Sequence, residues 1–296
     1  FSEAVDVEKG NITIKKSSND SIFETIDVTS NQVTGTGTSE IVIDPSLDLT
    51  SSTEYYVQID GTAFDDASGN SYAGISDKTS LSFTIEAFSQ IGEDIIGEEK
   101  GDLSGNSVSL SSDGSVVAIG AYGNDGNGFN SGHVRIYQNN NGTWTKIGSD
   151  IDGEFNSDYS GISTSLSSDG SIVAIGAHGN EPGNRGHVRI YQNVNNEWEK
   201  IGDDIDGEAA WDNFGRSVSL SSDGSVVAIG AHANNGNGPD SGHVRIFQNV
   251  NGTWKQAGND IYGKAIDDRS GLSVSLSSDG SIVAIGSPNN DDNGED

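Results

Sequence analysis

The sequence of 296 residues contains no cysteine and no methionine. Without cysteine there is no disulfide, no zinc–thiolate site and no thiol nucleophile. Methionine is missing even at position 1, so we expect the natural translation start to lie upstream of Phe1. No stretch of 18 apolar residues occurs, and we therefore expect no membrane-spanning segment.

Basic side chains are scarce, because 15 Lys and Arg stand against 45 Asp and Glu, for a formal net charge of −30. Such an excess of negative charge repels phosphate backbones and argues against nucleic acid as a partner. It suits a cation-rich setting, in which Ca²⁺ is the ion that the composition favours, although no motif requires a cofactor. Apolar residues are 32%, and the 40 glycines bring this tally into the globular range, which argues against a disordered chain.

Residues 1–87 have the pattern of short strands separated by polar turns. Thr, Ile, Val, Tyr and Phe dominate these segments, and no helix-period segment interrupts them. Several short strands at this spacing predict a β-sandwich. The predicted strands are Asn11–Lys16, Phe23–Val28, Glu40–Ile43, Glu54–Asp60 and Leu81–Glu86.

Residues 88–296 are repetitive. The string Leu-Ser-Ser-Asp-Gly begins at Leu110, Leu166, Leu220 and Leu276. Each copy is followed by Val-Ala-Ile-Gly and, in the first three, by Gly-His-Val-Arg-Ile. Four strands in about 55 residues predict a propeller blade. Three units open with a Trp and the first with Phe88, which divides the region into 88–143, 144–197, 198–253 and a truncated 254–296.

The first hairpin of each unit turns at Asp-Gly, which predicts its register. If Asp113-Gly114 form a two-residue turn, Leu110 faces Val117, and Ser109 faces Ala118. One side of the sheet is then large and aliphatic, and the other is small. We expect the bulky side of each blade to pack against the small side of its neighbour.

The second hairpin turns at Asn141-Gly142 and its equivalents. The same arithmetic places three histidines opposite three aspartates, with an arginine of each strand diagonal to the same aspartate. We therefore expect these histidines to be structural and held by a cross-strand Asp. The predicted pairs are His133 with Asp150, His187 with Asp204 and His243 with Asp260, and the arginines are Arg135, Arg189 and Arg245.

Antiparallel order predicts that the two tight turns of every blade lie at one end of the propeller. The second-to-third connections (122–132 and equivalents) and the connections to the next blade (152–160 and equivalents) lie at the other end. These are long, acidic and variable, and such loops on a rigid frame commonly carry binding. The candidate ligand-face residues are Tyr122, His178, His232 and Asp240.

Two of these loops place side-chain oxygens two residues apart before a glycine, as calcium loops do. The distal bidentate Glu of such loops is not evident, and ordinary turn chemistry is the alternative interpretation. The candidate calcium ligands are Asp125, Asn127, Asp291 and Asn293.

The segment 212–231, with Phe214-Gly215 and Gly230-Ala231, resembles the FG-GAP repeat of integrin-alpha-type β-propellers. The resemblance covers about residues 88–296, but the family's long calcium loop between the first two strands is only Ser-Ser-Asp-Gly here. Residues 1–87 resemble a bacterial Ig-like domain of the S-layer and surface-protein type, through Tyr55-Tyr56-Val57 and the closing Phe83-Thr84. The implied fold class is all-β, an Ig-like β-sandwich followed by an incomplete propeller of four-stranded antiparallel blades.

The resemblance implies a non-enzymatic extracellular or cell-surface adhesion module that binds glycan or protein through its variable loops. No catalytic motif is found. A glycan-active propeller enzyme and a ligand-free spacer of a large surface protein stay open as alternatives. Propellers have four to eight blades, so we also expect the remaining blades of the parent chain as partners. Alone, this segment should expose an unpaired blade face and aggregate or assemble.

Overall fold

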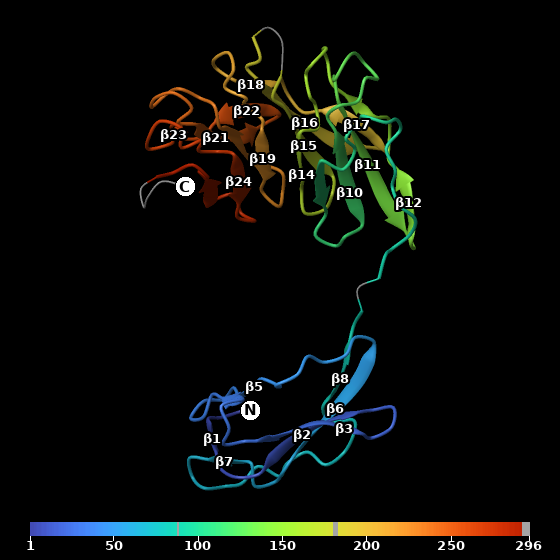
Figure 1. Cartoon of the computed structure of the whole chain (residues 1–296), viewed down its shortest axis with the longest axis vertical. Coiled ribbons are helices and arrows are strands. Elements are labelled where there is room, and N and C mark those ends of the chain that lie inside the picture. Colours follow the sequence, from blue (N-terminus) through green and yellow to red (C-terminus); the bar gives the residue numbers. More distant parts are fainter. Residues whose placement is uncertain (88, 180–182, 292–296) are drawn as a thin grey trace. The chain divides into compact units, whose positions relative to one another are not determined.

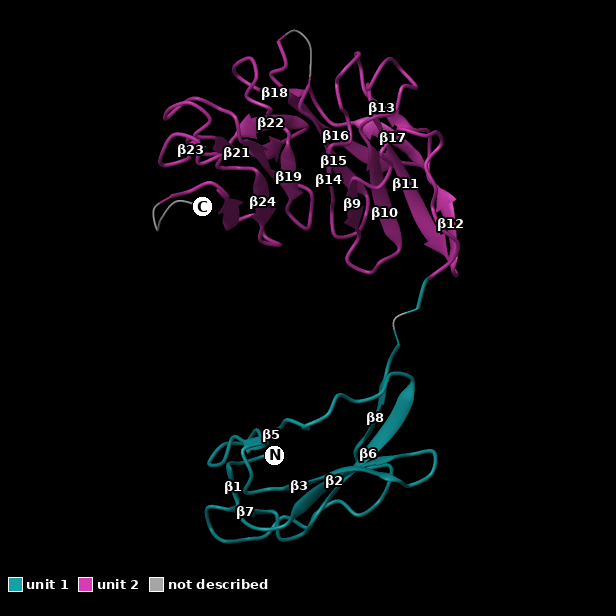
Figure 2. Ribbon diagram, viewed as in Figure 1, with its two compact units in different colours: residues 1–90 teal, residues 91–296 magenta. Residues whose placement is uncertain are grey.

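A computed structural model of the chain describes residues 1–87, 89–179 and 183–291, and Phe88 lies outside them. Every regular element in the described residues is a β-strand. The chain divides into two compact units, Phe1–Gln90 and Ile91–Asp296 (Figure 2). The all-β fold class predicted from the sequence is confirmed.

Unit 1 is a small sandwich whose main sheet has the order β3-β2-β6-β8, with bounds Ile22–Asp27, Asn11–Lys16, Thr53–Ile59 and Ser82–Ile85. The second layer contains two short pairs, β1–β7 (Val5–Val7, Phe64–Asp66) and β4–β5 (Val33–Thr34, Val42–Ile43). Ile12, Ile26, Tyr55 and Phe64 are buried between the layers. The pattern predicted β2 with its observed bounds, but it missed β1, β4 and β7, because strands of two or three residues have too few positions to alternate.

Unit 2 contains four antiparallel sheets side by side, named blades 1 to 4 here (Figure 1). Blade 1 contains β9 to β13, blade 2 β14 to β18, blade 3 β19 to β23, and blade 4 the pair β24–β25. The bounds in blade 1 are Ser107–Leu110, Val116–Ala121, His133–Asn140, Thr143–Lys146 and Ile151–Asp152. Those in blade 2 are Ser163–Leu166, Ile172–Ala177, His187–Val194, Glu197–Lys200 and Ile205–Asp206. Blade 3 has Ser217–Leu220, Val226–Ala231, His243–Val250, Thr253–Gln256 and Ile261–Tyr262, and blade 4 has Ser273–Leu276 and Val283–Gly286.

The first hairpin has the predicted register. Leu110 pairs with Val117 and Ser109 with Ala118, and the other blades repeat this pattern. The predicted packing of unlike faces is also confirmed: Ala118, Val134 and Ile136 of blade 1 share a buried cluster with Leu166, Val173 and Ile175 of blade 2. Blades 2 and 3 meet in the same way. The sheets do not close into a ring within the described residues.

The predicted His–Asp register is wrong by two residues. Tyr137 pairs with Lys146 as expected, but the strand then bulges at Gly148 and resumes with Ile151 opposite Val134. His133 therefore pairs with Asp152 in place of Asp150. The bulge requires a positive φ, which is 68° at Gly148 and 73° and 80° at its equivalents Gly202 and Gly258.

The bulge recurs in all three complete blades. His187 pairs with Asp206 in place of Asp204, and His243 with Tyr262 in place of Asp260. Both ring nitrogens of His187 and of His243 are buried without a hydrogen-bond partner. His187 Nδ1 lies 3.9 Å from a carboxylate oxygen of Asp158, which is not the predicted aspartate. Burial lowers the pKa of His133, His187 and His243, which keeps these strand histidines neutral.

Each of the three tryptophans that open a repeat, Trp144, Trp198 and Trp254, belongs to the fourth strand of the sheet that precedes it in the chain. Its indole N–H donates to a carbonyl oxygen some fifty residues earlier: Trp144 to Ile91 at 2.9 Å, Trp198 to Ile147 at 3.1 Å and Trp254 to Ile201 at 3.0 Å. Each indole thereby connects the outermost strand of its blade to the chain segment that precedes the first strand of that blade.

Candidate functional site

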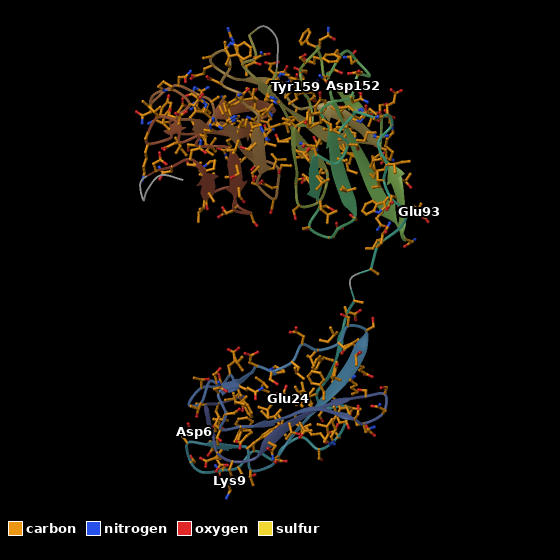
Figure 3. All side chains as sticks on the ribbon, viewed as in Figure 1. Asp6, Lys9, Glu24, Glu93, Asp152 and Tyr159 are labelled. Carbon is orange, nitrogen blue, oxygen red and sulfur yellow. The ribbon has the colours of Figure 1, made fainter. Side chains whose placement is uncertain are left out.

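The two kinds of long connection come together, as predicted, at one end of unit 2, called the loop end here. It comprises residues 122–132 and 152–160 and their equivalents in the following blades. The connections are bonded to each other through backbone groups: the Gly153 amide donates to Gly132 O at 2.8 Å, and the Tyr159 amide donates to Asn130 O at 3.1 Å. Figure 3 shows Tyr159 among these loops. The hydrogen-bonded connections of the loop end therefore form one continuous surface supported by the β-strands.

Large aromatic side chains are exposed on this surface. Phe129, Phe155 and Trp211 are 66%, 50% and 67% exposed. Phe129 and Phe155 come from neighbouring connections, which are joined by a 2.7 Å hydrogen bond from the Ser157 amide to Phe129 O. Exposed aromatic groups cost free energy in water, and clusters of them commonly mark interaction sites.

A row of rings crosses the loop end from blade 1 to blade 2. The Tyr122 and Tyr159 ring centroids are 6.2 Å apart, and the Tyr159 ring stacks on the His178 imidazole at 5.1 Å with an interplanar angle of 19°. Gly179 makes room for the Tyr159 ring, since a Cβ on Gly179 would collide with it. All three side chains are half-buried, so the row is partly accessible to solvent.

Arginine side chains act electrostatically on His178 and on its equivalent in blade 3, His232. Burial, followed by the charge of Arg216 and by His232, lowers the pKa of His178 to about 4. Burial, Arg216 and Arg269 likewise lower the pKa of His232, while Asp240 acts in the opposite direction. The Nδ1 atoms of both imidazoles are buried without a hydrogen-bond partner. Neutral imidazoles beside guanidinium groups offer a ligand both a ring face and charged donors.

The local backbone explains how Tyr159 and Arg269 reach this surface. Both occupy the second position of an Asp-x-x-Gly turn, where φ is 55° and 52°. Bulky residues rarely adopt such angles, and strain of this kind concentrates at functional positions. Each turn is fixed by the preceding buried Asp: the Glu154 amide donates to Asp158 at 2.9 Å, and the Lys264 amide donates to Asp268 at 2.8 Å.

Two of the four predicted ligand-face residues, Tyr122 and His178, are linked in the row through Tyr159. His232 and Asp240 interact electrostatically with each other, and Arg216 acts on both His178 and His232. The sequence interpretation missed Tyr159, Arg216, Arg269 and the exposed aromatics. The signal was present, because these positions differ between repeats whose framework is nearly identical: Tyr159 is replaced by Leu103, Asn213 and Arg269.

The predicted calcium ligands Asp125 and Asn127 lie in an exposed turn. The Asp125 carboxylate accepts a 2.7 Å hydrogen bond from the Asn130 amide, and the Asn127 side-chain amide donates to Gly153 O at 2.7 Å. The neutral copy in blade 3 makes equivalent bonds through Asn235 and Asn237. Asp291 is exposed at the end of the described residues, and Asn293 lies outside them.

A hollow of about 560 Å³ beside the row is lined by acidic side chains and Phe129. Most of these carboxylates already have structural partners: Asp102 accepts from the Asn124 side chain at 3.0 Å, Asp125 from Asn130, and Glu98 pairs with Arg135 at 3.2 Å. Three of the four carboxylates of the hollow therefore have a hydrogen-bond or ion-pair partner, and Glu99 is the fourth.

One mixed group of possible metal ligands occurs among the described residues: single atoms of Glu98, His133 and Asp150 lie within 4.8 Å of one another. Two of the three are already neutralised, because Arg135 contacts Glu98 and Lys146 contacts Asp150 at 2.5 Å. Both carboxylates of the group therefore already have a cationic partner, and we interpret the group as an ion-pair network.

The fold and the repeated turns define an Ig-like sandwich joined to an incomplete propeller. Residues 1–85 match the bacterial Ig-like domain family, and residues 97–137 and 205–247 match the FG-GAP repeat family. The chain thus combines a bacterial Ig-like domain with FG-GAP repeats, as the sequence resemblance implied. No curated protein matches the chain.

Two solved structures show a general similarity. Hydrazine synthase of Kuenenia stuttgartiensis is 11% identical at a TM-score of 0.44, with 94% of this chain and 67% of that chain covered. Sqt1 of Saccharomyces cerevisiae is 14% identical at a TM-score of 0.39, with 58% and 39% covered. Among the described residues, no helix is long and apolar enough to cross a membrane.

Proposed function

We propose that unit 2 is a non-enzymatic recognition module of an extracellular or cell-surface protein, and that it binds glycan at the loop end. The observation that carries this proposal is the row formed by Tyr122, Tyr159 and His178. Binding sites combine aromatic surface with a few convergent polar groups, and here Arg216 and the two imidazoles supply the polar groups.

The charge distribution supports the choice of this end. In a chain with a formal net charge of −30, five cationic side chains of unit 2 have an acidic partner within 4.0 Å among the described residues: Arg135, Lys146, Arg189, Lys200 and Arg245. Arg216 and Arg269 have none there and act on the imidazoles of the row instead. Their guanidinium groups can donate hydrogen bonds to sugar hydroxyl or carboxylate oxygens.

The proposal is tested with the full chain on an array of neutral and uronic-acid-containing glycans. We expect the affinity for the glycan to fall about tenfold in Tyr159→Ala and in Trp211→Ala. The loss of one stacking contact should reduce the binding free energy by about 1.4 kcal/mol. Val250→Ala is the matched control, because Val250 is 40% exposed at the end of β21, away from the row. Glycan binding that is insensitive to both Tyr159→Ala and Trp211→Ala would refute the site.

The same glycans also test the absence of catalysis. After incubation with the chain, chromatography of each glycan should show no new products. Released fragments that disappear with a carboxylate variant of the acidic hollow, such as Glu99→Gln, would establish a glycan-active enzyme instead. Binding of a protein ligand alone would keep the recognition role and overturn its glycan specificity.

A further inference from the structure

A buried acid and a buried base face each other beside the turn that carries Tyr159. Asp158 lies on the connection into blade 2, and His187 is the first residue of β16 in that blade. The Asp158 Oδ1 and His187 Nδ1 atoms are 3.9 Å apart, and both side chains are 0% exposed. Within the part of the chain that the structure describes, neither Asp158 Oδ1 nor either ring nitrogen of His187 has a hydrogen-bond partner. Buried polar atoms without a partner are costly and few in folded proteins, so this contact requires an explanation.

The same arrangement recurs one blade further on. Asp212 Oδ1 and both ring nitrogens of His243 are likewise buried without a partner among the described residues, and Asp212 acts on His243 electrostatically. An acid from the connection into a blade and a histidine from the third strand of that blade therefore meet as a property of the repeat.

The environment of the first pair determines which of its two groups binds a proton. Burial raises the pKa of Asp158 to about 6, against the Glu154 amide and Arg189, which lower it. Burial and Arg189 lower the pKa of His187 to about 4. In free side chains the imidazole binds the proton more tightly than the carboxyl group, so the order of the two groups is reversed here. The charged groups that face the pair are Glu154 on the same connection, Arg189 on β16, Lys200 on β17, and Asp204 and Asp206 on the segment around β18.

We propose that Asp158 and His187 form a proton-operated switch of the loop end. In mild acid the Asp158 carboxyl group takes a proton from solvent, donates a hydrogen bond to His187 Nδ1 and draws the turn that carries Tyr159 towards β16. Asp158 Oδ2 already accepts the Glu154 amide at 2.9 Å, so the proton binds to Oδ1, the atom that faces the imidazole. His187 accepts at Nδ1 in the tautomer that carries its proton on Nε2. A hydrogen bond requires the two atoms to approach from 3.9 Å by about 1 Å.

This movement reaches the row because Asp158 connects two parts of the turn. Its carboxyl group holds the Glu154 amide, and Tyr159, whose φ is 55°, follows it directly in the chain. The Tyr159 ring lies between Tyr122 and His178, so a shift of the turn alters both ring contacts. An effect on glycan affinity rests on the proposed function, whereas the proton uptake and the shift of Tyr159 do not, so a failure of glycan binding would leave the following titration unchanged.

NMR titration of the full chain from about pH 7.5 to about pH 4.5 tests the switch without a ligand. We expect the Asp158 carboxyl carbon to titrate near pH 6, while the His187 nitrogens keep the shifts of a neutral imidazole protonated at Nε2. The Tyr159 ring signals should move with the same midpoint. The contribution of the stacked His178 is separate, because its pKa is lowered to about 4. A His187 imidazolium at pH 5, an Asp158 carboxyl group that titrates near 4, or Tyr159 signals that do not follow Asp158 would overturn the proposal.

Two matched variants assign the transition to this pair. Asp158→Asn should abolish the movement of the Tyr159 signals near pH 6, because an amide does not ionise in this range. Asp212→Asn is the control, since Asp212 occupies the equivalent position one blade further on, and this variant should retain the transition. Native circular dichroism at neutral pH shows that each variant is folded, and the titration of the native chain decides alone if Asp158→Asn does not fold. A transition that persists in folded Asp158→Asn, or that is lost equally in both variants, would contradict the switch.

Discussion

The hydroxyl of Ser163 on blade 2 donates a 2.8 Å hydrogen bond to the carbonyl oxygen of Gly215, the glycine of the Phe-Gly pair that leads into blade 3. The contact recurs from Ser107 to Gly161 at 2.7 Å and from Ser217 to Gly271 at 2.8 Å. On the neighbouring strand, Gly176 approaches Gly215 so closely that a Cβ would collide with the same carbonyl oxygen. The two glycine motifs of the repeat therefore meet across the junction of neighbouring blades.

Gly176→Ala should weaken this junction. A methyl group against a backbone oxygen cannot be relieved by a side-chain movement, so the blades must separate slightly. We expect a loss of about 1–3 kcal/mol in the free energy of unfolding, measured by urea denaturation. Gly97→Ala is the control, because its Cβ would meet only the Ser104 side chain, at 3.0 Å. Equal losses in the two variants would show that the junction tolerates the methyl group.

Exact repetition explains how much of this fold the sequence could predict. The Asp113-Gly114 turn, one of four copies of the same hairpin, gave the Leu110–Val117 register and the unlike faces of each blade without reference to coordinates. The His133–Asp150 register failed because the bulge at Gly148 adds two residues to one strand. A positive φ at a glycine does not change the pattern of apolar residues, so this pattern could not reveal the bulge.

The site was predictable only in part, for a related reason. Tyr122, His178 and His232 follow conserved strand ends in each repeat, so their common end could be inferred. Tyr159 and Arg216 reach the row through turns whose direction depends on backbone angles. The end of unit 2 at which the row lies could therefore be predicted from the sequence, but the full set of side chains at the site could not.

Asp260→Asn should destabilise blade 3 more than Asp204→Asn destabilises blade 2. Arg245 is buried and donates to Asp260 at 3.0 and 2.9 Å, whereas Asp204 is bonded by Lys200 at 2.7 Å, nearer the surface. We expect losses of about 2–3 kcal/mol for Asp260→Asn and at most about 1 kcal/mol for Asp204→Asn. Urea denaturation of both variants measures the difference, and a larger loss for Asp204→Asn would contradict the assignment of the arginine partner.

Asn196→Gly should stabilise the chain. The equivalent hairpins turn at Asn141-Gly142 and Asn251-Gly252, where the glycine φ values are 90° and 82°. In blade 2 the second position is Asn196, which is held at 67°. Glycine adopts this angle without a steric penalty, so we expect a gain of about 0.5–1 kcal/mol. A shift of the thermal midpoint measures it, and Gly142→Asn should lose a similar amount in blade 1.

Acid should destabilise the chain in part through His178, because burial and the charge of Arg216 lower its pKa in the folded state to about 4 from the ordinary imidazole value of 6.5. A base with a depressed pKa contributes stability that is complete above the unfolded pKa. This stability is lost as the pH falls from 6.5 towards 4, because the unfolded state then binds the proton more tightly. The shift corresponds to roughly 3 kcal/mol at about 1.4 kcal/mol per unit. His178→Gln carries no proton in either state, so its loss of stability between pH 7 and pH 4.5 should be smaller than that of the native chain. Urea denaturation at the two pH values gives this comparison, with His178 followed by NMR titration. Identical losses, or an imidazole that titrates near 6.5, would show that Arg216 and burial do not hold the ring neutral.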